Sequence, residues 1–434
     1  MKLLLVTWYF PPSRTIAAVR LGKLARYLLA QGHDVRVLTP KEPPLPQELA
    51  VDFPEERVIR TAWQAPDPGG ASAAKRPTPA AAGTVPEGGV ASPSPLKRLR
   101  WRLHASMSEF PDGRAAWQAF AVTAGADLLK DWRPDAVFAS GPPFTTLFIG
   151  RELSEAFDLP LVLEFRDRWS EDPYAPPFFW RRWKIRRAED ALIGRAKALV
   201  TVSEPWAKDY RARYGKPTTV VYNGYDAELC GEGPFDGAAG RPGLEIVYTG
   251  GIYPGYRDPT PLFAAMKLLD DKGVACRMIF HGVRPGMVVP LAEAQGVTHL
   301  VEVREVLTHE EALRRQRESD ILVLLQWNDP KEQGNVPGKF FEYLGARRPI
   351  LVLGLREGVP ATIVRERDAG FFSNDPQEIA GQLERWLEIK QEKGLLPPVP
   401  ESGRDGYARD EQYARLEQFL EDLVAEGRSE AAAD

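Results

Sequence analysis

Residues 334–353 hold side chains that could together bind an anion, in the stretch GNVPGKFFEYLGARRPILVL. Pro337 and Gly338 favour a tight backbone at the start of a helix, and Lys339 lies in its first turn. Free N–H groups, the positive end of a helix dipole and a lysine form a site suited to phosphate. The pattern also fits an ordinary helix whose Lys339 and Glu342 face water, so both interpretations stay open at this point.

A strand and a helix must position these side chains, and the flanking sequence predicts both. Pro349 opens the apolar run at 350–353, which is typical of a central parallel strand. Similar runs recur at 244–248, 277–280 and 320–326, with helical patterns between them. This alternation predicts a parallel α/β sheet.

The first half of the chain carries its own α/β pattern. Residues 3–7 and 35–38 are predicted strands on either side of a helix over 17–31. Further strands are predicted at 135–140, 161–165, 198–202 and 220–222. Such a beginning predicts a doubly wound domain, in which loops at the carboxyl ends of the strands line a crevice.

The length of the chain, 434 residues, exceeds what one hydrophobic core usually covers, so we expect two domains of about 200 residues each. We place the first domain at 1–226, a Gly-rich and Pro-rich linker at 227–243, and the second domain at 244–400. Residues 401–434 contain a further predicted helix. Residues 64–95 are rich in Ala, Pro, Gly and Ser, and we interpret them as a disordered insertion in the first domain.

Composition argues against several classes of protein. The net charge of −4 disfavours a general nucleic-acid binder. Cys230 and Cys276 are far apart and lack metal-ligand spacing, so we expect a reducing compartment and no disulfide framework. The apolar start at 3–10 is too brief for a secretory signal, and no run of eighteen apolar residues occurs. We therefore expect a cytoplasmic protein.

Two runs combine basic and aromatic residues, LKRLRWRLH at 96–104 and FFWRRWKIRR at 178–187. Such runs suit an anionic membrane surface, where Trp lies at headgroup level and Arg meets lipid phosphate. Peripheral attachment to the inner face of a membrane is one interpretation. Amphipathic helices that pack their aromatic residues inward are another, and nucleic acid is a third that the acidic total charge disfavours.

The run at 334–344, followed by Arg-Pro-Ile-Leu at 348–351, resembles the donor-binding signature of glycosyltransferase family 4, a group of retaining enzymes with the GT-B fold. Ser-Gly-Pro-Pro-Phe-Thr-Thr at 140–146 and Glu-Phe-Arg-Asp-Arg-Trp at 164–169 resemble the subset of that family that builds cell-surface glycans. The resemblance implies an α/β protein of two Rossmann-like parallel-sheet domains facing a cleft. It also implies a last helix that crosses back to the first domain.

The resemblance implies roles for individual residues. Arg257 and Lys339 would grip the diphosphate of a nucleotide sugar, Glu342 would bind the ribose hydroxyls, and Asp167 would lie near the acceptor. The other implied donor-binding residues are Gly250, Gly251, Asn335, Val336, Pro337, Gly338 and Phe340. A tight turn alone also explains the glycine pair, and an ion pair with Arg166 or a helix cap also explains Asp167.

The sequence departs from the family at two positions near the donor. The arginine that usually accompanies the lysine would fall at about Gly251 or Ile252, so we expect Arg257 and Lys339 to carry the charge together. Gly334 stands eight positions before Glu342, where the family has a glutamate, and Glu332 is the nearest acidic residue in the loop.

We predict a metal-independent, retaining glycosyltransferase that moves a sugar from a nucleoside-diphosphate sugar to a glycan or lipid-linked acceptor, in cell-envelope polysaccharide biosynthesis. No Asp-x-Asp motif occurs, and we expect no cofactor or metal beside the nucleotide-sugar co-substrate. A nucleotide-sugar epimerase of the same architecture, for which His281 is the best-placed histidine, and a non-catalytic glycan-binding protein are the alternatives. The sugar, the nucleotide, the acceptor, the linkage and the oligomeric state stay open.

Overall fold

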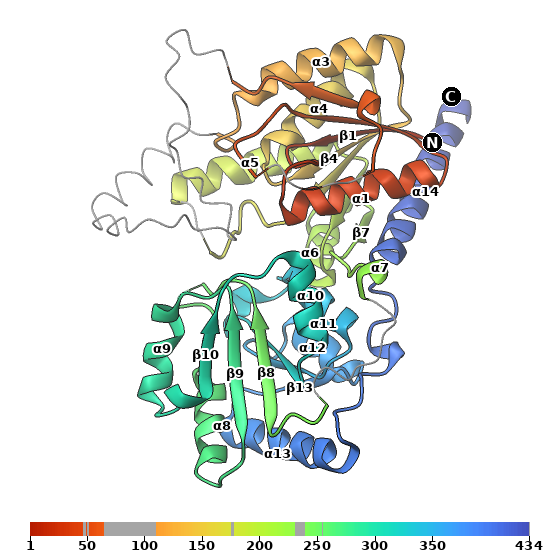
Figure 1. Ribbon diagram of the computed structural model, residues 1–434. Coiled ribbons are helices and arrows are strands. Elements are labelled where there is room, and N and C mark those ends of the chain that lie inside the picture. The colour runs from red at the N-terminus through yellow and green to blue at the C-terminus, as the bar shows by residue number, and fades with distance from the viewer. Residues whose placement is uncertain are drawn as a thin grey trace. The chain divides into compact units, whose positions relative to one another are not determined.

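The computed structural model describes residues 1–46, 49, 52–64, 110–174, 178–230, 239–253 and 255–433 (Figure 1). Within these, the chain forms two compact units. The first unit comprises the described residues up to 222 together with 413–433, and the second unit comprises those from 223 to 412. The predicted return of the last helix to the first unit is therefore confirmed. The predicted insertion, apart from position 64, and the basic run at 96–104 lie outside the described residues.

A seven-stranded parallel sheet with the order β3-β2-β1-β4-β5-β6-β7 forms the centre of the first unit. Its strands are β1 (Lys2–Thr7), β2 (Asp34–Pro40), β3 (Val58–Thr61), β4 (Ala136–Gly141), β5 (Leu161–Phe165), β6 (Ala198–Thr201) and β7 (Thr218–Val220). The strand order reverses between β1 and β4, and such a switch point is where doubly wound sheets bind ligands.

Helices cover both faces of this sheet, as the continuous apolar strands require. Leu3 and Leu5 of β1 pack with Leu416 of α14 (Arg409–Ala433) and with α1 (Ile16–Ala30), which crosses α14 at a steep angle in Figure 1. Leu4 and Val6 face the other way. They pack in a cluster with residues of α3 (Trp117–Asp131), α4 (Thr145–Phe157), α5 (Phe179–Arg195) and α6 (Glu204–Tyr214).

The second unit contains a six-stranded parallel sheet with the order β10-β9-β8-β11-β12-β13. Its strands are β8 (Leu244–Thr249), β9 (Cys276–His281), β10 (Val301–Arg304), β11 (Ile321–Leu325), β12 (Ile350–Leu353) and β13 (Gly370–Phe372). Its helices are α7 (Ala227–Cys230), α8 (Thr260–Asp270), α9 (Pro285–Ala294), α10 (His309–Arg317), α11 (Gly338–Ala346), α12 (Val359–Glu366) and α13 (Pro376–Lys393).

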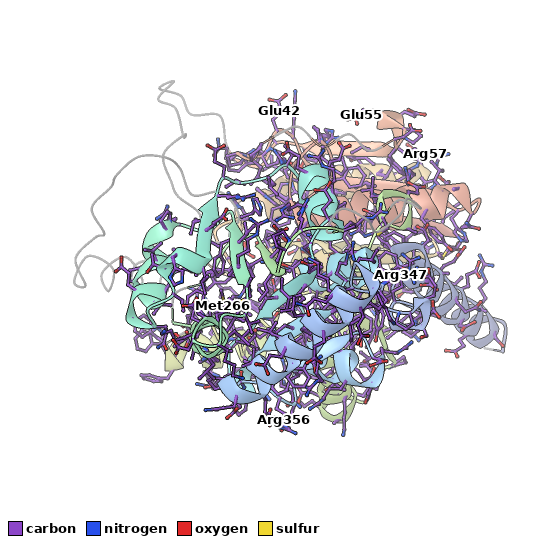
Figure 2. All side chains as sticks on the ribbon, turned by 60° about the horizontal axis from the view of Figure 1, so that its bottom comes forward. Glu42, Glu55, Arg57, Met266, Arg347 and Arg356 are labelled. Carbon is purple, nitrogen blue, oxygen red and sulfur yellow. The ribbon has the colours of Figure 1, made fainter. Side chains whose placement is uncertain are left out.

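Side-chain contacts assign these helices to the two faces of the sheet. Ile246 and Tyr248 of β8 pack in one cluster with α8, α9 and α13. Thr249 points to the opposite face, where α10 and α11 lie, because Gln316 donates to its hydroxyl and its own N–H donates to Tyr343. α11 ends at Ala346, and its C-cap Arg347 (Figure 2) adopts a left-handed φ of 55° and donates from Nε to the carbonyl of Val399.

The central strands predicted from the sequence are confirmed to within one or two residues, and β7 begins two residues before its predicted position. Three strands have no counterpart in the prediction, namely β3, β10 and β13. All three lie at edges of the sheets. They are only three or four residues long, and β3 and β10 carry charged side chains, so they lack the apolar run that marks a central strand.

Candidate functional site

The carboxyl end of β8 and the start of α11 meet at Gly250. Gly250 has a φ of 92°, and a Cβ atom built there would lie 2.9 Å from the Nζ of Lys339. A side chain would therefore be strained by the backbone conformation and would also press on the lysine. The glycine pair is thus a turn that allows close approach of Lys339 to the backbone after β8.

Lys339 is held by the backbone and by an aromatic ring. Its Nζ donates to the carbonyl of Thr249 at 2.5 Å and lies 4.0 Å from the ring centroid of Tyr248. Among the described residues no carboxylate forms an ion pair with it. Burial lowers the pKa of Lys339, because the charged ammonium loses water that these contacts do not replace.

Arg257 lies on the same turn. Its Nη1 donates to the carbonyl of Gly251 at 3.2 Å, and its guanidinium carbon lies 4.4 Å from the ring centroid of Tyr253. Its Nε is buried and has no hydrogen-bond partner in the part of the chain that the structure describes. A buried charged N–H of this kind gains strongly from an anion.

Tyr248 connects the two cations, although the sequence did not single it out. Its hydroxyl donates to the carbonyl of Gly251 at 2.8 Å. Burial acts to raise the pKa of Tyr248, but Lys339 and Arg257 outweigh burial and leave the pKa below its ordinary value. The structure therefore brings Arg257 and Lys339 together around one phenol and one glycine turn, although 82 positions separate them in the sequence.

The N-terminus of α11 completes this region. Its N-cap is Pro337, and no side chain caps the helix there. Gly338 begins the helix beside the partly exposed Asn335, whose side-chain amide donates to Glu332 at 3.2 Å. Glu332 is buried in that contact. Val336 and Phe340 are also buried, so any contribution they make to a site comes through packing of the loop and the helix.

Glu342 is tied to the same network through Gln316 of α10. The Nε2 of Gln316 donates to Glu342 at 3.3 Å and to the hydroxyl of Thr249 at 3.0 Å. The Nδ1 of His309 lies 3.8 Å from the other carboxylate oxygen. Gln316 and His309 were missed by the sequence analysis, because only the folded α10 brings them beside α11.

His281 ends β9 directly beside Thr249. Its side chain is buried, and neither ring nitrogen makes a well-formed hydrogen bond to a described residue. Burial lowers the pKa of His281, with a further contribution from the Arg315 cation, which favours the neutral ring. No carboxylate among the described residues is hydrogen-bonded to it.

Asp167 lies in the first unit, directly after β5 and Arg166. It is exposed and makes no hydrogen bond or ion pair with a described residue, so neither a cap nor a pair with Arg166 is seen. Nearby protein atoms displace water from around the carboxylate, and this desolvation raises the pKa of Asp167. The Arg166 cation partly offsets the rise. Arg166 itself donates to the hydroxyl of Ser140 at 3.0 Å.

Beneath Asp167 lies a buried ion network that the sequence analysis missed. The carboxylate of Glu164 accepts from Nε and Nη2 of Arg20, at 3.1 and 2.6 Å, and from the hydroxyl of Ser140. Burial acts to raise the pKa of Glu164, but Arg20 and Arg166 outweigh it and hold the pKa low. The network anchors the ends of β4 and β5, from which the loops at 140–146 and 164–169 emerge.

A cavity of about 350 Å³ elsewhere in the second unit is lined by Arg356 (Figure 2), Arg365, Gly370, Phe371, Phe372 and Glu378. None of the predicted site residues lines it. It is therefore separate from the Gly250 turn.

Comparison with known proteins assigns the fold. Residues 17–225 match the family model of a glycosyl transferase 4-like domain. The solved structure of sucrose-phosphate synthase from Thermosynechococcus elongatus is 13% identical, with a TM-score of 0.61 over 98% of this chain and 99% of that chain. Alr3699/HepE from Anabaena, in complex with UDP and glucose, is 14% identical, with a TM-score of 0.58 over 97% and 99%.

A third structure, the apo form of the lipopolysaccharide outer core galactosyltransferase WaaB, is 11% identical, with a TM-score of 0.57 over 97% of this chain and 99% of that chain. A search of curated protein sequences finds no match. These likenesses confirm the predicted fold of two Rossmann-like domains, and the family match confirms the resemblance to glycosyltransferase family 4 over residues 17–225.

Proposed function

We propose that this protein is a retaining glycosyltransferase that uses a nucleoside-diphosphate sugar, because residues 17–225 match a glycosyl transferase 4-like domain and the chain has the GT-B fold. One observation carries the donor assignment. Arg257 and Lys339 meet at the Gly250 turn, both partly desolvated and neither paired with a carboxylate of a described residue. Two cations in this state are suited to a dianionic diphosphate.

The donor would lie along the carboxyl edge of the second sheet. Its diphosphate would contact Arg257, Lys339 and the uncapped N–H groups at the start of α11, where the helix dipole adds positive potential. Glu342, oriented by Gln316, would accept hydrogen bonds from the ribose hydroxyls. A structure of HepE in complex with UDP-glucose makes this nucleotide sugar the first ligand to test.

The same groups would act in the reaction. As the glycosidic bond to the donor breaks, negative charge develops on the leaving diphosphate, and Arg257 and Lys339 would stabilise that charge. In a retaining transfer the acceptor hydroxyl attacks on the face that the leaving group departs from. The donor phosphate can then take the acceptor proton, so no protein base is compulsory and the two cations can serve without a metal ion. Asp167 would bind the acceptor from the first unit.

For the acceptor we propose a glycan or a lipid-linked sugar of cell-envelope polysaccharide assembly. The loops at 140–146 and 164–169, with their resemblance to enzymes of cell-surface glycans, support this choice. The fold likeness to an enzyme named for lipopolysaccharide outer core synthesis is consistent with it. A lipid-linked acceptor lies in a membrane, so the protein would work as a peripheral protein at the inner face.

The test is a panel of nucleotide sugars, scored first by thermal stabilisation and then by release of nucleoside diphosphate with membrane lipid extract. We expect stabilisation by one nucleotide class and acceptor-dependent release of the diphosphate. No stabilisation by any nucleotide would refute the proposal. Conversion of the nucleotide sugar to an isomer without acceptor would instead establish an epimerase.

A further inference from the structure

Helix α5 consists of two halves with different environments. In its C-terminal half, Leu192 and Ile193 are buried in the core of the first unit. Glu189 is buried beside them and accepts a hydrogen bond from the backbone N–H of Ser170 at 3.1 Å. This half fixes the helix to the unit.

The N-terminal half of α5 instead exposes large aromatic side chains. Phe179 is 80% exposed, Trp183 60% and Trp180 41%. Seven large hydrophobic side chains are exposed among the described residues, and these three fall within five consecutive positions. The ring of Trp180 stacks on that of Phe178 at 4.7 Å and lies edge-on to that of Phe179 at 5.0 Å, so three neighbouring rings contact one another. Clustered exposure of this kind marks an interaction site.

The N-terminal half of α5 is strongly basic, and among its cations Arg186 pairs with Glu171 at 2.9 Å and approaches Asp190 to 3.9 Å. Residues 178–187 contain five Arg and Lys and no acidic residue, whereas the whole chain carries a net charge of −4. The first turn of α5 holds no acidic side chain. Cations near a helix N-terminus oppose the helix dipole, so these residues weaken the helix that carries them. An external anionic surface would remove that repulsion.

Contacts within the unit keep several of the cations beside aromatic rings. The guanidinium carbon of Arg187 lies 4.4 Å from the ring centroid of Trp183, and the Nζ of Lys184 lies 4.0 Å from that of Phe110. Arg182 is exposed and forms no ion pair with a described residue. Aromatic rings and cations therefore lie side by side at this end of the helix. This combination suits the headgroup region of a bilayer, where Trp and Phe enter the interface and Arg meets phosphate.

We propose that Phe179, Trp180, Trp183, Arg182 and Arg187 form a docking face that binds an anionic lipid bilayer. This docking face rests on the proposed function, because its role would be to bring the transferase to a lipid-linked acceptor. A second copy of the chain is a poor occupant, since two such cationic faces repel each other. Within the described residues every helix is too short or too polar to cross a membrane, so attachment would be interfacial.

The experiment is sedimentation of the full-length protein with phosphatidylcholine vesicles that contain or lack phosphatidylglycerol. We expect binding that requires the anionic lipid, a blue shift of tryptophan fluorescence, and release by salt. Changing Arg182 and Arg187 to Glu should lower the vesicle partition coefficient by at least about fivefold per residue. The triple variant Phe179→Ser, Trp180→Ser, Trp183→Ser should lower it by at least roughly tenfold.

Leu229→Ser is the matched control, since Leu229 is also an exposed hydrophobic residue but lies in α7, and it should bind vesicles as the wild type does. If the aromatic variant fails to fold, the charge variant decides. Equal binding to neutral and anionic vesicles, or unchanged binding by a folded variant, would overturn the docking face. Binding of nucleic acid or self-association through these residues would do so as well. Vesicle binding is measured without sugar nucleotide and nucleotide binding without vesicles, so either proposal can fail alone.

Discussion

The N-termini of α11 and α5 both carry cations, and these cations differ in burial. α11 presents Lys339 at the Gly250 turn, desolvated and held by the carbonyl of Thr249 and the ring of Tyr248. α5 presents five cations among exposed aromatic rings. A buried cation gains most from a ligand that replaces its lost water with specific hydrogen bonds. Exposed cations gain from the potential of a charged surface, which salt screens. This difference predicts two ligands whose binding differs in its sensitivity to salt.

The largest expected effect is a loss of nucleotide binding at α11. Lys339→Ala should weaken nucleoside-diphosphate binding by about a hundredfold, the scale of one lost charge-assisted hydrogen bond in a desolvated site. Isothermal titration calorimetry measures it. Lys272→Ala is the control, because Lys272 is exposed and pairs with Glu384 away from the site. Unchanged affinity in the Lys339 variant would remove the basis of the donor assignment.

Salt should weaken vesicle binding at α5 more than nucleotide binding at α11. Raising sodium chloride from about 50 to about 500 mM should lower vesicle binding by roughly tenfold, because the exposed cations of α5 are screened. Nucleotide affinity should change by less than about threefold, because the cations at the Gly250 turn are partly shielded from solvent. An equal loss in both assays would contradict the contrast between buried and exposed cations.

The pH dependence should also differ. Burial holds the pKa of Lys339 below its ordinary value in the free protein, and a bound diphosphate would raise it. Binding above the lowered pKa therefore takes up a proton, so nucleotide affinity is full below that pKa and falls by up to about tenfold per pH unit above it. Calorimetry in buffers of different ionisation enthalpy would detect the uptake. Vesicle binding through arginine side chains should stay constant over the same range.

A smaller effect is expected from Tyr248→Phe, which removes the hydroxyl that holds Gly251 but keeps the ring beside Lys339. Nucleotide affinity should fall by about fivefold, the scale of one neutral hydrogen bond. A Tyr343→Phe variant is the comparison, because its hydroxyl contacts Thr249 on the other face of the same strand. If Tyr248→Phe has no effect, the phenol does not position the turn.

Much of this fold could be predicted from the sequence, and the exceptions have physical reasons. Central strands such as 161–165 and 350–353 are buried on both faces and therefore read as apolar runs. The edge strand β10, with the sequence VEVR, has no such run and was missed. Lys339 and Glu342 could be singled out because they lie close together in one motif. Gln316 and Tyr248 could not, because their relation to the site arises only when α10 and β8 are in place.

The packing of α14 determines which fragments of the protein can fold alone. Tyr413, Leu416 and Leu420 belong to the same buried cluster as Leu3 and Leu5 of β1, and the hydroxyl of Tyr413 donates to the carbonyl of Arg20 at 2.8 Å. A fragment that ends at position 222 would contain every strand of the first sheet but would keep only α1 on the face that α14 also covers, so part of that face would be exposed. We expect it to aggregate alone and to become soluble when a synthetic peptide of residues 409–433 is added. The first unit is thus complete in space but assembled from two distant stretches of the chain.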